Sequence, residues 1–360
     1  MRLKRSRNRT LWLISAILFL SLVGFFAWVI KLHRDYQRIP SQHLIGNKIS
    51  NVEALGKRGF PFSFLVMSDT HNHDIGETLL REAIDIDKGD ASFLIHVGDF
   101  VNNPDLWDHQ FFLMNMTVEV KPPFPIFLAP GNHDIDYFPS KTKGRGQRVT
   151  PEIYESLYGS RSFDFIFNDC LFILCGIDLN NQAGYLDYLR ETLSKKGVGK
   201  KYIFVFIHYP PGRLVKYMGG SSLPHEAEFL NLVESYKVTR CFFGHYHGYR
   251  QEQVRGVNLT VLGGGGGRLK LWQSKWGKFH HLLKISVDEN MIIEDMLTLP
   301  KKVSTPTRTF KKWIFLNLFP IIQNSIWLLY LVSTILLILS GFFFFKFLKM
   351  IRQNDSTKLK

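Results

Sequence analysis

Acidic, amide and imidazole side chains follow five apolar segments of this chain, each where the segment ends. They lie in the stretches SDTHNH, GDF, PGNHD, FIHYP and GHYH, which contribute Asp69, His71, Asp99, Asn132, His133, Asp134, His208, His245 and His247. Carboxylate, amide and neutral imidazole groups are common ligands of divalent and transition metal ions. Each short motif is frequent by chance, but five in a row predict a metal centre.

The elements that must position these residues follow from hydrophobic periodicity. Apolar, β-rich runs predict strands at 62–68, 91–97, 125–129, 162–167, 170–177, 202–208, 241–243, 281–287 and 291–297. Helical spacing predicts helices at 75–87, 183–196 and 225–236. Early alternation of strands and helices, with hairpins late in the chain, predicts an α/β fold with mixed sheets. Ligand sites in such sheets form beyond the carboxyl ends of strands, so the five motifs are expected at one edge.

The order D-x-H, G-D, G-N-H-D, H and G-H-x-H resembles the calcineurin-like metallophosphoesterase superfamily over about residues 62–250. The resemblance implies a sandwich of two mixed β-sheets flanked by helices, and a centre of two metal ions (Mn, Fe or Zn). It implies that the first ion is held by Asp69, His71, Asp99 and His247. It implies that the second is held by Asp99, Asn132, His208 and His245, with Asp99 as the bridge. His133 would be the proton donor or a stabiliser of the leaving group rather than a ligand, and Asp134 would orient His133.

The chemistry that this site would support is metal-dependent phosphoester hydrolysis, with a metal-bridging hydroxide that attacks phosphorus. Ser/Thr protein phosphatases of the superfamily carry an arginine shortly after the Gly-Asp pair, and GDFVNNPD has none, which counts against that class. The tyrosine ligand of purple acid phosphatases is not evident in the D-x-H frame. The five glycines Gly263 to Gly267 match no phosphate-binding motif and predict a loop that is flexible or closely approached.

The distribution of charge along the chain distinguishes two possible anionic partners, nucleic acid and an acidic lipid bilayer. The chain carries a formal charge of +14, and all of the excess lies in residues 1–10 and 301–360. Residues 31–300 contain 30 basic and 30 acidic residues. A neutral central domain argues against nucleic acid as a partner, whereas basic ends suit the surface of an acidic lipid bilayer.

Two long uncharged runs predict transmembrane helices at 11–30 and 326–345. Five basic residues lie outside each run, against three close to it on the domain side (Lys31, Arg34 and Arg38; Arg308, Lys311 and Lys312), so both termini are expected in the cytoplasm. The domain would then face the periplasm, the cell exterior or a lumen. The predicted organisation is a basic tail (1–10), a transmembrane helix (11–30), a linker (31–61), the phosphoesterase domain (62–300), a linker with an interfacial segment (301–325), a transmembrane helix (326–345) and a basic tail (346–360).

The leading hypothesis is a membrane-anchored phosphoesterase that acts on a phosphorylated small molecule, lipid or envelope glycan. Two alternatives stay open: a phosphodiesterase or nuclease of the same superfamily, and a membrane scaffold without catalytic activity. The filled set of ligand positions disfavours the scaffold, and the neutral domain disfavours the nuclease. The sequence leaves the substrate, the metal and the oligomeric state open.

Overall fold

The computed structural model describes residues 2–40, 43–56, 59–139, 146–215, 221–269, 277–299, 306–322 and 326–355. The chain divides into two compact units. One is Ile39–Thr309, and the other joins Met1–Arg38 to Phe310–Lys360. The larger unit contains all residues of the predicted metal centre.

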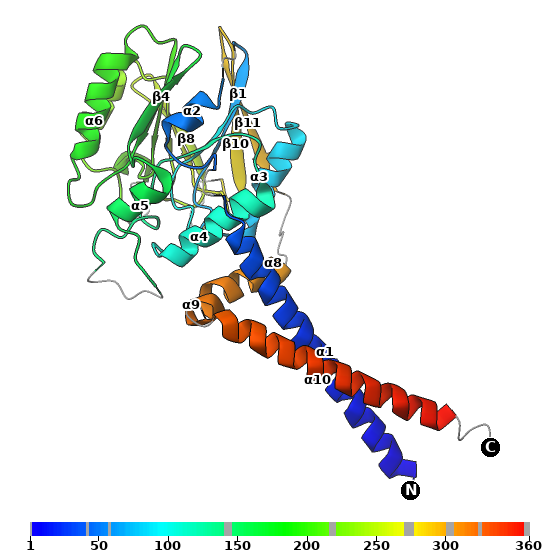
Figure 1. Cartoon of the computed structure of the whole chain (residues 1–360). Coiled ribbons are helices and arrows are strands. Elements are labelled where there is room, and N and C mark those ends of the chain that lie inside the picture. Colours follow the sequence, from blue (N-terminus) through cyan, green and yellow to red (C-terminus); the bar gives the residue numbers. More distant parts are fainter. Residues whose placement is uncertain are drawn as a thin grey trace. The chain divides into compact units, whose positions relative to one another are not determined.

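The first sheet of the larger unit carries three of the five motifs. Its strand order is β11-β10-β1-β2-β3, in which β1, β2 and β3 are parallel and β10 is antiparallel to both neighbours. Figure 1 labels β1, β10 and β11 of this sheet. The strands are β1 (Phe62–Met67), β2 (Leu94–His96), β3 (Ile126–Leu128), β10 (His281–Val287) and β11 (Ile292–Thr298). Each overlaps a predicted strand, although β2 and β3 are shorter than expected.

The second sheet carries the remaining two motifs. Its order is β4-β5-β6-β7-β9-β8, with a parallel run from β5 to β9 and antiparallel strands at both edges. The strands are β4 (Phe163–Phe167), β5 (Cys170–Cys175), β6 (Tyr202–Ile207), β7 (Arg240–Phe243), β8 (Tyr249–Val254) and β9 (Val257–Leu262).

The β8–β9 hairpin is missing from our sequence prediction. Strand β8 (YRQEQV) is a polar edge strand, and its turn, Arg255-Gly256, is not one of the common Asn-Gly or Asp-Gly pairs. Both turn residues have positive φ, as a two-residue hairpin turn of this kind requires. The turn geometry is therefore regular, but its residue types did not predict a hairpin turn.

An aromatic core joins the two sheets. Alternate residues of a strand point to opposite faces, so Phe64 and Val66 of β1 pack between the sheets, whereas Leu65 and Met67 pack against helices. The ring centroid of Phe64 lies 5.2 Å from that of Phe93, which is also buried. Burial of each such phenylalanine stabilises the fold by about 1.5–3 kcal/mol. The packed core thus fixes the positions of the strand ends, and the site residues follow these ends.

Helices cover the outer face of each sheet. They are α3 (Asp74–Ile86), α4 (Leu106–Met114), η1 (Asn115–Val120), α5 (Pro151–Tyr158), α6 (Gly184–Thr192), η2 (Leu193–Gly197), η3 (Gly212–Val215) and α7 (Glu226–Ser235). The short helix α2 (Ile49–Glu53) instead packs Val52 against the core between the sheets. Helix α3 packs on the first sheet, and α6 and α7 pack on the second. These three were predicted, whereas α4 and α5 were not.

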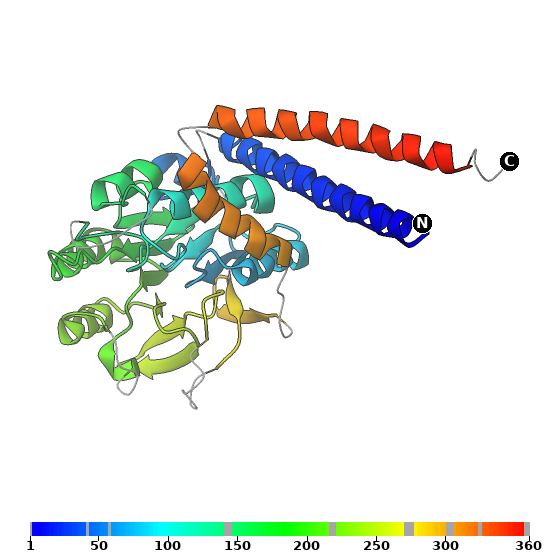
Figure 2. The ribbon, with the colours of Figure 1, turned by 90° about the horizontal axis from the view of Figure 1, so that it is seen from below.

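The smaller unit consists of helices α1 (Arg2–Gln37), α8 (Pro306–Trp313, which starts in the larger unit), η4 (Ile314–Leu318), α9 (Phe319–Ile322) and α10 (Ile326–Asp355). Figure 2 shows α1 and α10 side by side, and Phe19 and Phe343 have ring centroids 6.0 Å apart. Among the described residues, one helix, Ala16–Gln37, is long and apolar enough to cross a membrane. The apolar part of α10 is shorter, Tyr330–Lys346, so two spans stay a prediction.

Candidate metal centre

The ends of β1, β2, β3, β6 and β7 bring the predicted site residues together at one edge of the sandwich. Asp69, His71, Asp99 and His245 follow their strands with positive φ values of 57°, 49°, 55° and 68°. A residue other than glycine adopts this left-handed region at a cost of about 1–2 kcal/mol. Such conformations concentrate at functional sites, where they turn the chain sharply.

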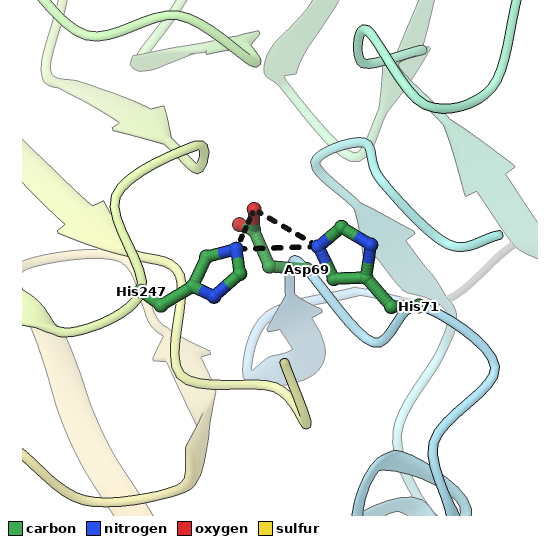
Figure 3. A group of neighbouring side chains, drawn as sticks. All are labelled: Asp69, His71 and His247. Carbon is green, nitrogen blue, oxygen red and sulfur yellow. Dashed lines mark hydrogen bonds and ion pairs between the residues drawn. The ribbon is translucent and has the colours of Figure 1, made fainter. Parts of the chain in front are cut away.

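Asp69, His71 and His247 form the first ligand group (Figure 3). Nε2 of His71 lies 3.2 Å from Nε2 of His247, and Oδ1 of Asp69 lies 3.4 Å from the latter atom. Oδ2 of Asp99 lies 3.8 Å from Nε2 of His71, so this group extends to Asp99. Asp69, His71 and Asp99 are buried, and His247 is partly exposed.

Asp99, His208 and His245 form the second ligand group, with ligand atoms within 4.8 Å of one another. Nε2 of His208 lies 3.3 Å from Oδ2 of Asp99. Asn132 lies close to this group, because the backbone N–H of the next residue, His133, donates to Oδ1 of Asp99 (2.8 Å). Among the described residues, Oδ1 of Asn132 is buried without a hydrogen-bond partner. A buried polar atom without a partner costs free energy, and a bound cation would be a partner for this oxygen.

Backbone carbonyls select the nitrogen that each imidazole presents. A carbonyl oxygen only accepts hydrogen bonds, so the ring nitrogen beside it must carry the proton. The Nδ1 atoms of His133, His208 and His247 lie 2.7, 2.9 and 2.8 Å from the carbonyl oxygens of Asn102, Val97 and Arg268. In the neutral rings, Nε2 is therefore free to bind a metal or exchange a proton.

The spacing of the donor atoms fits divalent ions. An ion about 2.1 Å from each donor separates neighbouring donors by about 3.0 Å at right angles and about 3.4 Å at tetrahedral angles. The separations of 3.2, 3.4 and 3.3 Å lie in or near this range. The two ligand groups thus have the donor types and the donor spacing that divalent metal ions require.

The electrostatics of the site favour positive charge between the two groups. Burial opposes the ionised form of Asp69 and Asp99, but nearby histidines, His208 and His247 above all, overcome this and lower both pKa values. Burial lowers the pKa of His71 to about 4, which leaves it neutral. Burial also opposes the charged form of His208, yet Asp99 raises its pKa to about 10.

His133 lies at the ligand groups, since its ring together with His71 and Asp99 could also hold an ion, and Asp134 is the next residue. The resemblance implied that Asp134 orients His133, but no hydrogen bond joins the two side chains among the described residues. Instead, the ring donates to the carbonyl of Asn102. The buried Asp134 carboxylate accepts hydrogen bonds from the backbone N–H groups of Asp99 (2.7 Å), Gly131 (2.8 Å) and Val101 (3.2 Å). Asp134 therefore fixes the backbone of the ligand loops, because three amide donors lie within its reach.

The five-glycine loop, Gly263–Gly267, is closely approached, which is one of the two possibilities that the sequence left open. The N–H groups of Gly265 and Gly267 donate to the carbonyls of Ser68 and Asp69 (3.0 and 2.7 Å). A Cβ added to Gly267 would lie 2.7 Å from Cε1 of His247 and 2.8 Å from Cδ2 of His71. The loop is thus a wall of the first ligand group.

Several supporting residues were missed by sequence reasoning. The hydroxyl Oγ of Ser68 lies 2.6 Å from Oδ2 of Asp69, and the backbone N–H of His281 donates to the carbonyl of Gly264 (3.0 Å). In helix α4, the buried His109 donates from Nε2 to the carbonyl of Asp134 (2.9 Å). The hydroxyl of Tyr158 donates to Nδ1 of that histidine (3.0 Å). Only Ser68 adjoins a ligand motif, so no sequence signal points to the others.

Comparison with known proteins defines the class. The calcineurin-like phosphoesterase family matches residues 62–249, which is more than half of the chain. The chain therefore belongs to the calcineurin-like phosphoesterase family. This confirms the predicted family, the α/β fold of two mixed sheets, and the class of a metal-dependent phosphoesterase. The roles of the individual site residues stay predictions. Among curated proteins, none matches the chain significantly.

Solved structures share the fold at low identity. A purple acid phosphatase from yellow lupin (Lupinus luteus) seeds is 15% identical with a TM-score of 0.52, over 67% of this chain and 52% of the lupin chain. This match therefore spans only about half of the lupin enzyme. GAP50, the anchor in the inner membrane complex of Plasmodium, is 14% identical with a TM-score of 0.46, over 71% and 95% of the two chains. A dimetal phosphatase from Danio rerio is 13% identical with a TM-score of 0.46, over 67% and 99%.

Proposed function

We propose that this protein is a membrane-anchored phosphoesterase that hydrolyses a phosphate ester or pyrophosphate bond in a lipid- or glycan-linked substrate. The observation that carries the proposal is the pair of ligand groups that meet at Asp99. Two ions bound there would neutralise charge on the phosphoryl oxygens and activate a water molecule. The chain supplies the rest of the site. Asp69 and Asp99 contribute buried carboxylates, backbone carbonyls hold the imidazole rings, and His133 is a partly exposed histidine.

His133 is the proposed proton donor to the leaving group. Its ring centroid lies 4.7 Å from that of His71, so it stands beside the first ligand group. The Asn102 carbonyl holds its Nδ1, which leaves Nε2 to exchange a proton with substrate. His133 is less buried than His71 or Asp99, as a group that meets substrate must be.

Replacing His133 with asparagine tests this role. We expect kcat for p-nitrophenyl phosphate to fall by about 10²–10⁴-fold, the usual contribution of a general acid. Metal content should not change, because His133 is not a proposed ligand. The matched control is His225→Asn, since His225 is exposed and asparagine tolerates its positive φ of 54°. Equal rates in wild type and His133→Asn would refute the role, and loss of metal would make His133 a ligand instead.

The proposed anchor consists of α1 and the apolar part of α10. Support comes from the length and hydropathy of Ala16–Gln37 and from the uncharged run in 326–345. Five basic residues lie outside each run, whereas three lie close to each run on the domain side, namely Lys31, Arg34 and Arg38 after the first and Arg308, Lys311 and Lys312 before the second. The positive-inside rule then places both termini in the cytoplasm and the catalytic domain on the opposite side. This position favours a lipid or envelope-glycan substrate.

Single cysteines test this orientation. The native residues Cys170, Cys175 and Cys241 are buried, which keeps background labelling low. In sealed right-side-out vesicles, a membrane-impermeant maleimide should label Glu289→Cys, in the exposed turn of the β10–β11 hairpin, without detergent. Arg9→Cys should be labelled only after detergent is added. The reverse pattern would show that the domain faces the cytoplasm, and labelling of both without detergent would exclude this anchored topology.

A further inference from the structure

Arg268 directly follows the five-glycine loop, and the proposed function gives its side chain no role. Its backbone already belongs to the site, because its carbonyl accepts the Nδ1–H of His247 (2.8 Å). Its side chain is exposed. Among the described residues, no acidic group forms a salt bridge with the Arg268 guanidinium, whereas Arg148, Arg161, Arg190 and Arg240 all have such partners.

The loop brings Arg268 close to the ligands because it has no side chains. Cβ atoms at Gly263, Gly264 and Gly265 would collide with the Tyr246 carbonyl, the His281 ring and the Ser68 carbonyl, respectively. At Gly267, a Cβ would lie 2.7 and 2.8 Å from the rings of His247 and His71. The Cα of Arg268 is only about 3.8 Å further along the chain. Because the glycine loop has no side chains, it places the cationic residue Arg268 next to the first ligand group.

We propose that Arg268 determines substrate specificity by binding a second anionic group beside the phosphate at the metal centre. A guanidinium holds phosphate or carboxylate through two parallel hydrogen bonds, which makes it suited to this role. The substrate class is then a diphosphate, or a phosphate ester with a neighbouring anionic group. This inference rests on the proposed function and narrows it, because a monoester with a neutral leaving group would not use Arg268.

The test compares two stable ligands of the manganese-loaded full-length protein in detergent. Methylphosphonate offers one anionic group, and methylenediphosphonate offers two. Isothermal titration calorimetry measures both affinities in wild type, Arg268→Gln and Arg268→Lys. Glutamine keeps the backbone carbonyl that holds His247 and removes only the charge. Arg190→Gln is the control, because Arg190 is an exposed arginine on α6 that pairs with Asp187 and Glu228.

We expect Arg268→Gln to weaken binding of methylenediphosphonate by about tenfold, as loss of a charged hydrogen-bond pair predicts, and to leave methylphosphonate within about twofold. Arg268→Lys should fall between the two, and Arg190→Gln should bind like wild type. The proposal is overturned if methylenediphosphonate affinity is unchanged in Arg268→Gln, if both ligands weaken equally, or if Arg190→Gln has the same effect. The test measures binding, so it separates failure of this proposal from absence of hydrolysis.

Discussion

Asp99→Asn is expected to lower the rate of p-nitrophenyl phosphate hydrolysis by at least about 10²–10³-fold, the range for loss of one preorganised electrostatic contact. Asp99 is the carboxylate that the two ligand groups share, with Oδ2 3.8 Å from Nε2 of His71 and 3.3 Å from Nε2 of His208. Asparagine removes the negative charge that would hold both cations together. The measurement is kcat in purified full-length protein with excess Mn²⁺.

Asparagine is the substitution that isolates this charge. It has the shape of aspartate, and its oxygen can still accept the 2.8 Å hydrogen bond from the backbone N–H of His133. It also tolerates the positive φ of 55° at this position better than most residues do. Asp85→Asn on the exposed surface of α3 is the control and should keep full activity. If Asp99→Asn hydrolysed substrate as fast as the control, Asp99 could not bridge two ions.

Gly267→Ala is expected to reduce activity by about 10²-fold, the penalty for displacing reacting groups by about 1 Å. The new methyl group would lie 2.7 Å from His247 and 2.8 Å from His71, closer than real Cβ contacts allow. Both rings are proposed ligands of one ion, so either the rings or the loop must move. Overpacking of this kind also destabilises a fold by about 1–3 kcal/mol, so the melting temperature should fall as well.

Gly59→Ala is the matched control for this change. No atom lies within 4 Å of the position that its Cβ would take, and its φ is not in the left-handed region. Activity and melting temperature should therefore stay at wild-type values. A Gly267→Ala protein with full activity would show that the loop yields without disturbing the ligands. In that case the loop would not be a wall of the site.

The fold and the ligand clusters were predictable because their signals are local. Each motif follows an apolar run, and the alternation of strands and helices predicts the edge at which the motifs meet. The position of Asp99 between two histidine groups needs only this topology and the family pattern. What the motifs cannot show is the partner of each ring nitrogen, because the accepting carbonyls belong to distant loops.

The supporting contacts could not be predicted because they depend on tertiary packing. The partner of the His133 ring is the backbone carbonyl of Asn102, and a backbone carbonyl leaves no mark in the residue types of a motif. His109 lies in helix α4, whose hydrophobic pattern we did not recognise, and 25 residues separate it from the Asp134 carbonyl. The glycine loop follows the unpredicted β8–β9 hairpin, so its place against Ser68 had no sequence signal.

The most direct test of the dinuclear centre is the metal content of the purified protein, measured by inductively coupled plasma mass spectrometry. After growth with Mn, Fe and Zn and removal of loosely bound ions, we predict about two divalent ions per wild-type chain. Asp99→Asn should retain one or none, because it lacks the shared carboxylate. A wild-type chain that binds no transition metal, or an Asp99→Asn chain that still binds two, would contradict the account.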